Sequence, residues 1–201
     1  HTWLRRQRQM CIRDRDRVVL SLKNKVWIKP QGNSLTIKKN RDINFDGLIT
    51  AGKTQYYGSD FSFIYNDFKL NMAHCDSMFI WADYLESKRK GSLVRSLSNI
   101  RSLEGYIEID EPDNKSGVDT SHHEFPILHS NTPTYVYYDD PSIQKGIYKR
   151  EDFMFIVEPF EMDSLDEFTN EGLNLKGLFK SGGIFPDFTE SLMIMPDYSL
   201  G

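Results

Sequence analysis

The sequence predicts an all-β protein with at most one short helix. Only three alanines occur among 201 residues, whereas a mainly helical protein would use alanine, the best helix former, throughout its helices. Aromatic residues make up 13% of the chain, which is enough for a packed core and typical of strands. Short alternating apolar runs separated by turn residues recur along the chain. We therefore expect a sandwich-like pair of sheets or part of a β-solenoid.

The first half of the chain holds the clearest strand signals. Three short runs, 18–22, 26–28 and 35–37, are separated by turn residues such as Pro30-Gln31-Gly32-Asn33. From Ile43 to Met72 apolar residues alternate with polar ones, so each strand there carries one apolar face.

One segment has helical spacing instead. Apolar residues recur at steps of three and four from Leu93 to Leu103, after a potential N-cap at Ser92 and before Gly105. We therefore predict a short helix over 92–103.

The second half returns to strand patterns. Alternating or apolar runs at 106–109, 135–138 and 153–157 predict three further strands. The polar stretch 110–120 between the first two predicts a loop.

Part of the sequence repeats. Residues 43–70 align without a gap on 173–200, with two glycines five residues apart in each copy. A third partial match makes related β-units of about 43–72, 146–162 and 173–200. Such copies, stacked or paired, would bury apolar faces that a single copy leaves exposed.

Residues 1–15 differ from the rest in composition. They hold five arginines and one aspartate, and they resemble translated sequencing-adapter DNA, so we interpret them as a non-native leader.

The remaining segment, residues 16–201, has 20 basic and 28 acidic residues, a net charge of −8. This charge argues against nucleic acid as a partner, and no apolar run reaches the roughly 20 residues of a transmembrane helix. We expect residues 16–201 to be truncated at both ends.

Several short strings resemble a known group of proteins. The strings are 113–117 (Asp-Asn-Lys-Ser-Gly), 135–140 (Tyr-Val-Tyr-Tyr-Asp-Asp), 163–166 (Asp-Ser-Leu-Asp), 183–186 (Gly-Ile-Phe-Pro) and 196–201 (Pro-Asp-Tyr-Ser-Leu-Gly), together with Phe45-Asp46-Gly47 and Ala51-Gly52. They resemble internal parts of very large bacterial β-rich envelope or surface proteins that have no assigned activity. The resemblance implies a structural repeat module, joined to the remainder of a longer polypeptide and located in the periplasm, at the outer membrane or on the cell surface. It implies no cofactor.

Aromatic residues provide a second functional hypothesis, glycan binding. Rings on strands can stack against a sugar while nearby Asp and Asn side chains bind its hydroxyls, although strands also favour Tyr and Trp for packing alone. The candidate ligand-binding residues are Trp27, Trp81, Tyr135, Tyr137 and Tyr138, with Tyr56 and Tyr57 as further platform candidates.

Other chemistry has weaker signals. The loop 110–119 offers oxygen ligands for calcium from Asp110, Asp113, Asn114 and Asp119, but it lacks the EF-hand pattern. The histidines at 122, 123 and 129 have no metal-ligand spacing. A solvated turn therefore remains the simpler interpretation of this loop.

The sequence gives only weak signals for two enzymatic hypotheses and one lipid hypothesis. His74-Cys75-Asp76 would supply a thiol and a base, yet neighbours in sequence rarely reach the geometry required. A glycosidase fragment would use paired carboxylates drawn from Asp139, Asp140, Glu158, Glu161, Asp163 and Asp166. A lipid groove of an envelope bridge protein would need the repeated apolar positions to face a cavity instead of a core.

Overall fold

The computed structural model describes residues 8–11, 17–84, 91–139 and 144–201. Within these residues the chain forms fifteen strands and three single 3-10 turns, so the all-β prediction is confirmed. The strands are β1 (Arg8–Cys11), β2 (Val18–Ser21), β3 (Val26–Pro30), β4 (Ser34–Ile37), β5 (Ile43–Ala51), β6 (Thr54–Ile64), β7 (Lys69–Asp83), β8 (Leu93–Arg95), β9 (Ile100–Glu108), β10 (Ile127–Ser130), β11 (Thr134–Tyr137), β12 (Phe153–Val157), β13 (Glu161–Met162), β14 (Leu175–Ser181) and β15 (Phe188–Leu192), and the turns are η1 (Gln31–Asn33), η3 (Gln144–Gly146) and η4 (Asn170–Gly172).

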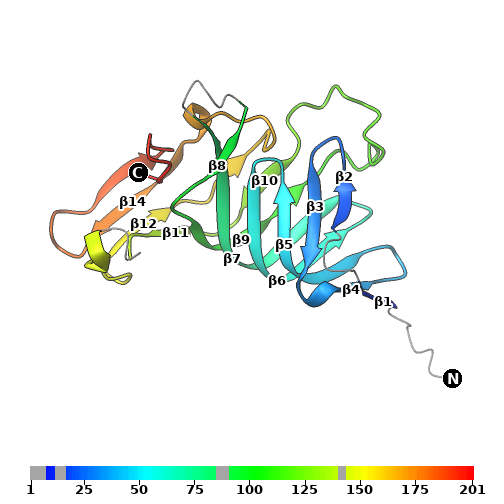
Figure 1. Ribbon diagram of the computed structural model, residues 1–201, viewed down its shortest axis with the longest axis horizontal. Coiled ribbons are helices and arrows are strands. Elements are labelled where there is room, and N and C mark those ends of the chain that lie inside the picture. Colours follow the sequence, from blue (N-terminus) through cyan, green and yellow to red (C-terminus); the bar gives the residue numbers. More distant parts are fainter. Residues whose placement is uncertain (1–7, 12–16, 85–90, 140–143) are drawn as a thin grey trace.

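The strands form one antiparallel meander that does not close on itself. From β5 onward the sheet is a meander, in which each strand pairs with the strand that follows it. Three strands of the meander are interrupted, and their halves are β8 and β9, β10 and β11, and β12 and β13. The free edge of β5 is shared by β3 and β4, which carry β2 and β1 on their other sides. Figure 1 shows this progression from blue at one end of the molecule to red at the other.

A line of irregularities crosses the strands and bends the sheet. The β5/β6 register shifts between Phe45 and Gly47, and the β6/β7 register shifts next to Gly58. In the same row the η1 turn separates β3 from β4, and short breaks separate β10 from β11 and β12 from β13. Bulges increase local twist and bend a strand. We call this row the bend line.

Glycine permits close strand contact at the bend line. A Cβ on Gly58 would lie 2.0 Å from the carbonyl oxygen of His74, and one on Gly105 would lie 2.0 Å from that of His129. No side chain fits in such a space, so the two backbones approach each other only because these positions are glycine.

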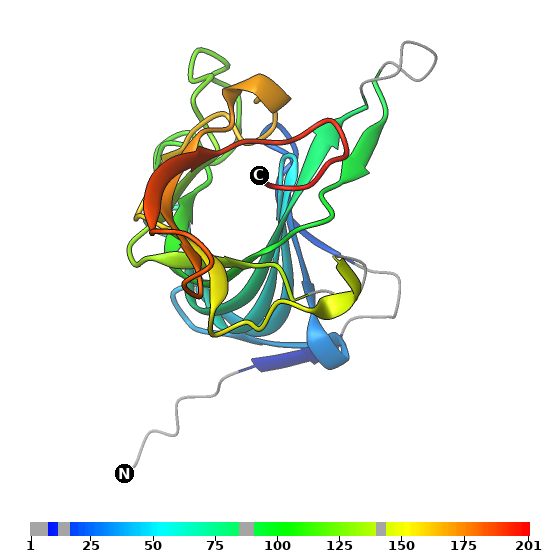
Figure 2. The ribbon, with the colours of Figure 1, turned by 90° about the vertical axis from the view of Figure 1, so that its left-hand side faces the viewer.

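Bending brings the two halves of each long strand around a common core. One buried cluster contains Ile28, Ile49 and Tyr56 from one side of the bend line and Phe63 and Leu70 from the other. Viewed end-on in Figure 2, the sheet curls around this core. The all-β fold is thus achieved by halves of the same bent strands facing each other, without stacked coils.

Segments distant in sequence close the molecule. The loop after β13 crosses the β5–β6 turn, where the Leu165 carbonyl accepts a 2.7 Å hydrogen bond from the Lys53 amide. Lys53 Nζ in turn contacts Asp83 at 2.9 Å. At the C-terminus, the Leu97 amide donates to the Tyr198 carbonyl and Leu200 is buried.

The predicted helix over 92–103 is wrong, because these residues form β8 and the start of β9. Ile100 and Leu103 both face the core, since Ser102 has a φ of 57° and resets the alternation between them. The irregularity at Ser102 therefore places buried residues three positions apart, which is the spacing that a helix would give. Leu97, which lies four residues after Leu93 and would share the apolar face of such a helix, is 72% exposed.

The two long copies of the proposed repeat both fold as hairpins. Residues 43–70 contain β5–β6 and residues 173–200 contain β14–β15. Gly52 and Gly182 lie at the corresponding turns with φ of 56° and 63°. The repeat itself remains a prediction.

Two further predictions concern the N-terminal leader and membrane-spanning helices. Most of the leader 1–15 lies outside the described residues, apart from β1, whose backbone pairs with β4. In the described part of the chain, no helix combines the length and apolar character needed to cross a bilayer.

Candidate functional site

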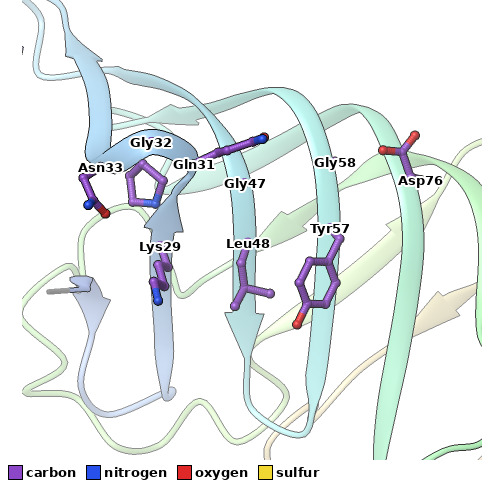
Figure 3. A pocket seen from close by; sticks show the side chains of 10 residues that line it. Lys29, Gln31, Gly32, Asn33, Gly47, Leu48, Tyr57, Gly58 and Asp76 are labelled. Atoms are coloured by element: carbon purple, nitrogen blue, oxygen red, sulfur yellow. The ribbon is translucent and has the colours of Figure 1, made fainter. Parts of the chain in front are cut away.

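The outer face of the sheet carries a row of side chains that begins at Lys29. Lys29 pairs with Leu48 across β3 and β5, and Leu48 pairs with Tyr57 across β5 and β6. Directly opposed residues in a sheet project to the same face. Figure 3 shows these three side chains side by side on neighbouring strands. Tyr57 is 38% exposed, although its neighbour Tyr56 is completely buried on the opposite face.

An open cleft of about 640 Å³ lies where this row meets the bend line (Figure 3). Part of its wall is backbone, because Gly47 and Gly58 have no side chains. Polar side chains line the rest of the cleft together with Leu48 and Tyr57. Its lining residues are Lys29, Pro30, Gln31, Gly32, Asn33, Gly47, Leu48, Tyr57, Gly58 and Asp76. The cleft thus combines an exposed aromatic ring with a carboxylate, an ammonium and two amides, the donors and acceptors that a polyhydroxylated ligand requires.

The row continues across the sheet beyond Tyr57. Tyr57 pairs with Ser77, Ser77 with Arg101, and Arg101 with Tyr135. From β3 to β11 the row makes five strand-to-strand steps, about 24 Å along the sheet at the usual spacing. It is therefore long enough for an extended ligand.

A second row of residues lies beside the first and has an aromatic residue at each end. Trp27 is opposite Thr50, which is opposite Gln55, which is opposite Phe79. The Phe79 ring makes an edge contact with Tyr57, with 5.8 Å between centroids. The two rows therefore touch.

Arginines cover three of the aromatic rings. The guanidinium carbons lie 4.4 Å from the ring centroid for Arg17 on Trp27, 4.4 Å for Arg95 on Phe79 and 4.6 Å for Arg150 on Tyr137. We call the two rows with these arginines the aromatic–arginine face: Trp27, Lys29, Leu48, Tyr57, Phe79, Arg95, Arg101, Tyr135 and Tyr137, with Arg17 and Arg150.

The structure brings together part of the predicted aromatic set. Trp27, Tyr135 and Tyr137 lie on the aromatic–arginine face, with the two tyrosine rings stacked at 5.9 Å. Trp81 is directly opposite Arg95, so it lies on the same side of the sheet, at the far end of β7. Tyr138 is different, because it packs against Phe153 and Phe179, and burial raises its pKa to about 12.

Sequence reasoning missed several residues of this face. Lys29, Leu48, Phe79, Arg95 and Arg101 were not selected, because only the strand register places them beside the tyrosines. Tyr57 and Tyr56 were both platform candidates, but neighbours on a strand project to opposite faces, so only Tyr57 is exposed and Tyr56 is unsuitable for binding. Burial strongly raises the pKa of Tyr56, as expected for a phenol in the core.

Of the four weak calcium candidates, Asp110, Asp113, Asn114 and Asp119, Asp110 is already engaged by the protein. This carboxylate is buried, and both of its oxygens already accept hydrogen bonds from the protein. The donors are Lys23 at 3.3 Å, Asn24 at 2.9 Å, Asn114 at 3.1 Å and the Glu111 amide at 2.9 Å. Among the described residues no cluster of His, Cys, Asp and Glu has the arrangement of a metal site.

The proposed thiol and its base lie on opposite faces. Cys75 is buried in the core, and burial raises the pKa of its thiol to about 12. His74 is outside and contacts Asp60 at 3.1 Å. The thiol therefore stays protonated and inaccessible, which is unsuitable for a nucleophile.

Several carboxylates considered for glycosidase chemistry are engaged by basic side chains. Asp139 binds Arg150 at 2.7 Å, Glu161 contacts His129 at 3.0 Å and Asp166 contacts Lys25 at 3.1 Å. Asp140 lies outside the described residues.

Comparison with known proteins found no matching family model, no matching curated protein and no matching solved structure.

Proposed function

We propose that this chain is a non-catalytic module of a longer bacterial envelope or surface protein, and that it binds glycan through its aromatic–arginine face. The observation that carries the proposal is the cleft beside Tyr57. There the exposed Tyr57 ring lies next to Leu48, with Lys29 on the far side of Leu48. Asp76 comes from the next strand, and the amides of the η1 turn also line the cleft. Sugars present C–H faces to rings and hydroxyls to such polar groups.

The non-catalytic part of the proposal is based on the positions of the reactive groups. The Cys75 thiol is buried, and Asp139 and Asp166 are engaged by Arg150 and Lys25. The repeated apolar positions, among them Phe45 and Leu175, belong to the buried core. These placements favour a binding surface over either an enzyme or a lipid groove.

The test is affinity gel electrophoresis of the full chain in gels that contain neutral or acidic polysaccharides. We expect retardation by at least one polysaccharide, and we expect Tyr57→Ala to abolish it while leaving the circular dichroism spectrum unchanged. Tyr65→Ala is the matched control, because Tyr65 is a partly exposed tyrosine with Arg41 over its ring, 4.9 Å away, but it lies outside the aromatic–arginine face. Absence of retardation across the panel would leave the purely structural module as the better proposal.

A further inference from the structure

The aromatic–arginine face is basic although the chain is acidic overall. The formal net charge of the whole sequence is −4. Nevertheless Lys29, Arg95 and Arg101 gather on this face, and among the described residues no carboxylate forms an ion pair with any of them. Composition alone does not explain this local excess of positive charge.

The arginine side chains are held in place by contacts that leave donors available. Arg95 is exposed and its guanidinium lies over the Phe79 ring. Contact with a ring face positions a guanidinium without consuming its five N–H donors. Arg101 is fixed by a bond from Nε to Asn99 Oδ1, 2.9 Å long, which leaves its two terminal nitrogens as donors. Positioned guanidiniums of this kind suit bidentate recognition of carboxylates and related oxyanions.

We propose that the ligand of this face is an acidic glycan, a polysaccharide with carboxylate groups along its chain. This inference rests on the proposed glycan-binding function and specifies its substrate class. A sugar ring would lie against Tyr57 and Leu48 in the cleft, and carboxylates farther along the chain would reach Arg101 and Arg95. The row between β3 and β11 supplies the length for several sugar units.

The accessibility of the rings favours a glycan over a single-stranded nucleic acid. Sequence-independent binding of single strands depends on open aromatic faces for base stacking. Here Trp27, Phe79 and Tyr137 are each covered by an arginine, and none of the three is more than partly exposed. Tyr57 offers the more open ring.

The experiment compares polygalacturonate with its methyl-esterified form, in which the backbone is the same but the carboxylates are masked. Binding is measured by isothermal titration calorimetry at low and moderate NaCl, with oligo-dT as a third probe. We expect polygalacturonate to bind at least tenfold more tightly than the ester and to weaken as salt rises. Arg95→Gln and Arg101→Gln should each weaken polygalacturonate binding about tenfold, since each loses a charge-assisted contact.

Arg41→Gln is the matched control, because Arg41 also lies over a tyrosine ring but outside this face. It should bind like the parent protein. Equal affinity for the acidic and esterified polymers would overturn the acidic ligand while preserving glycan binding. Failure of both polymers, together with no neutral polysaccharide bound in the gels, would overturn both proposals, and tighter binding of oligo-dT would replace them with nucleic acid.

Discussion

Asn24 and Asp110 join the two halves of the bent sheet at the ends farthest from the bend line. Asn24 Nδ2 donates to Asp110 Oδ2 at 2.9 Å and to the Ile109 carbonyl at 2.6 Å. Asn24 belongs to the β2–β3 turn, whereas Asp110 follows β9, 86 residues later. Both side chains are buried, so this contact fixes the spacing between the halves where no strand connects them.

Replacing Asp110 with alanine should destabilise the protein by about 2–4 kcal/mol. The substitution removes an acceptor shared by Lys23, Asn24, Asn114 and the Glu111 amide, and it leaves buried donors with fewer partners. The free energy of unfolding from urea titrations measures the loss. Asp113→Ala, in the same loop but exposed, should change it by no more than about 0.5 kcal/mol. Equal effects of the two substitutions would show that the loop, and not this contact, matters.

Gly58→Ala should unfold the protein or cost about 3 kcal/mol. Its new Cβ would meet the His74 carbonyl oxygen at 2.0 Å, and neither backbone has room to move without breaking the β6–β7 pairing. Gly172→Ala provides the contrast, because the nearest atom to its Cβ is the Thr169 hydroxyl at 3.5 Å. There we expect no loss, and a gain of up to about 1 kcal/mol from the stiffer unfolded chain. Thermal unfolding of both variants distinguishes close approach at the bend line from a general intolerance of alanine.

The Cys75 thiol should resist labelling until the protein unfolds. In a Cys11→Ser background it should react with a disulfide reagent at pH 8 only in denaturant, because it is buried and its pKa is raised to about 12. The unfolded thiol loses its proton near pH 9 and the folded one near 12, so folding stability is unaffected below pH 9 and declines from there to about 12. Cys75→Ala should show a smaller alkaline decline. Rapid labelling of the native protein would contradict the buried placement.

Acid should selectively weaken the contact between Lys69 and Glu108. Burial works to raise the pKa of Glu108, but the 2.7 Å bond with Lys69 and the nearby His129 outweigh it and hold the pKa below its usual range. A lowered carboxyl pKa contributes stability above the unfolded value of about 4.5, and this contribution is lost as pH falls through the folded pKa. Lys69→Met should therefore be less stable than the parent at pH 7, with the difference shrinking below pH 4.5. A difference that stays constant to pH 3 in urea titrations would refute this assignment.

The strands were predictable from sequence because one face of each is buried. Alternation marked Ile43 to Met72 as strand, and the polar loop after Ile109 was equally clear. The bends were not predictable, because a bulge such as the one at Ser102 resets the alternation and imitates a helix. The candidate site depends on those bends and on register. For this reason Trp27 and Tyr135 were selected by residue type, whereas Arg95, inside the predicted helix, was missed.

The meander also determines how this chain can fold. From β5 onward most strands that pair in the sheet are also close in sequence, with exceptions such as β10 and β13, so most pairs form across a small sequence separation, which favours rapid folding. A growing polypeptide could add one hairpin after another at the edge left by the last. The contacts of Asn24 with Asp110 and of Lys53 with Leu165 span 86 and 112 residues and must wait for the later strands. Because these contacts form last, weakening them should speed unfolding of the folded protein without slowing its folding.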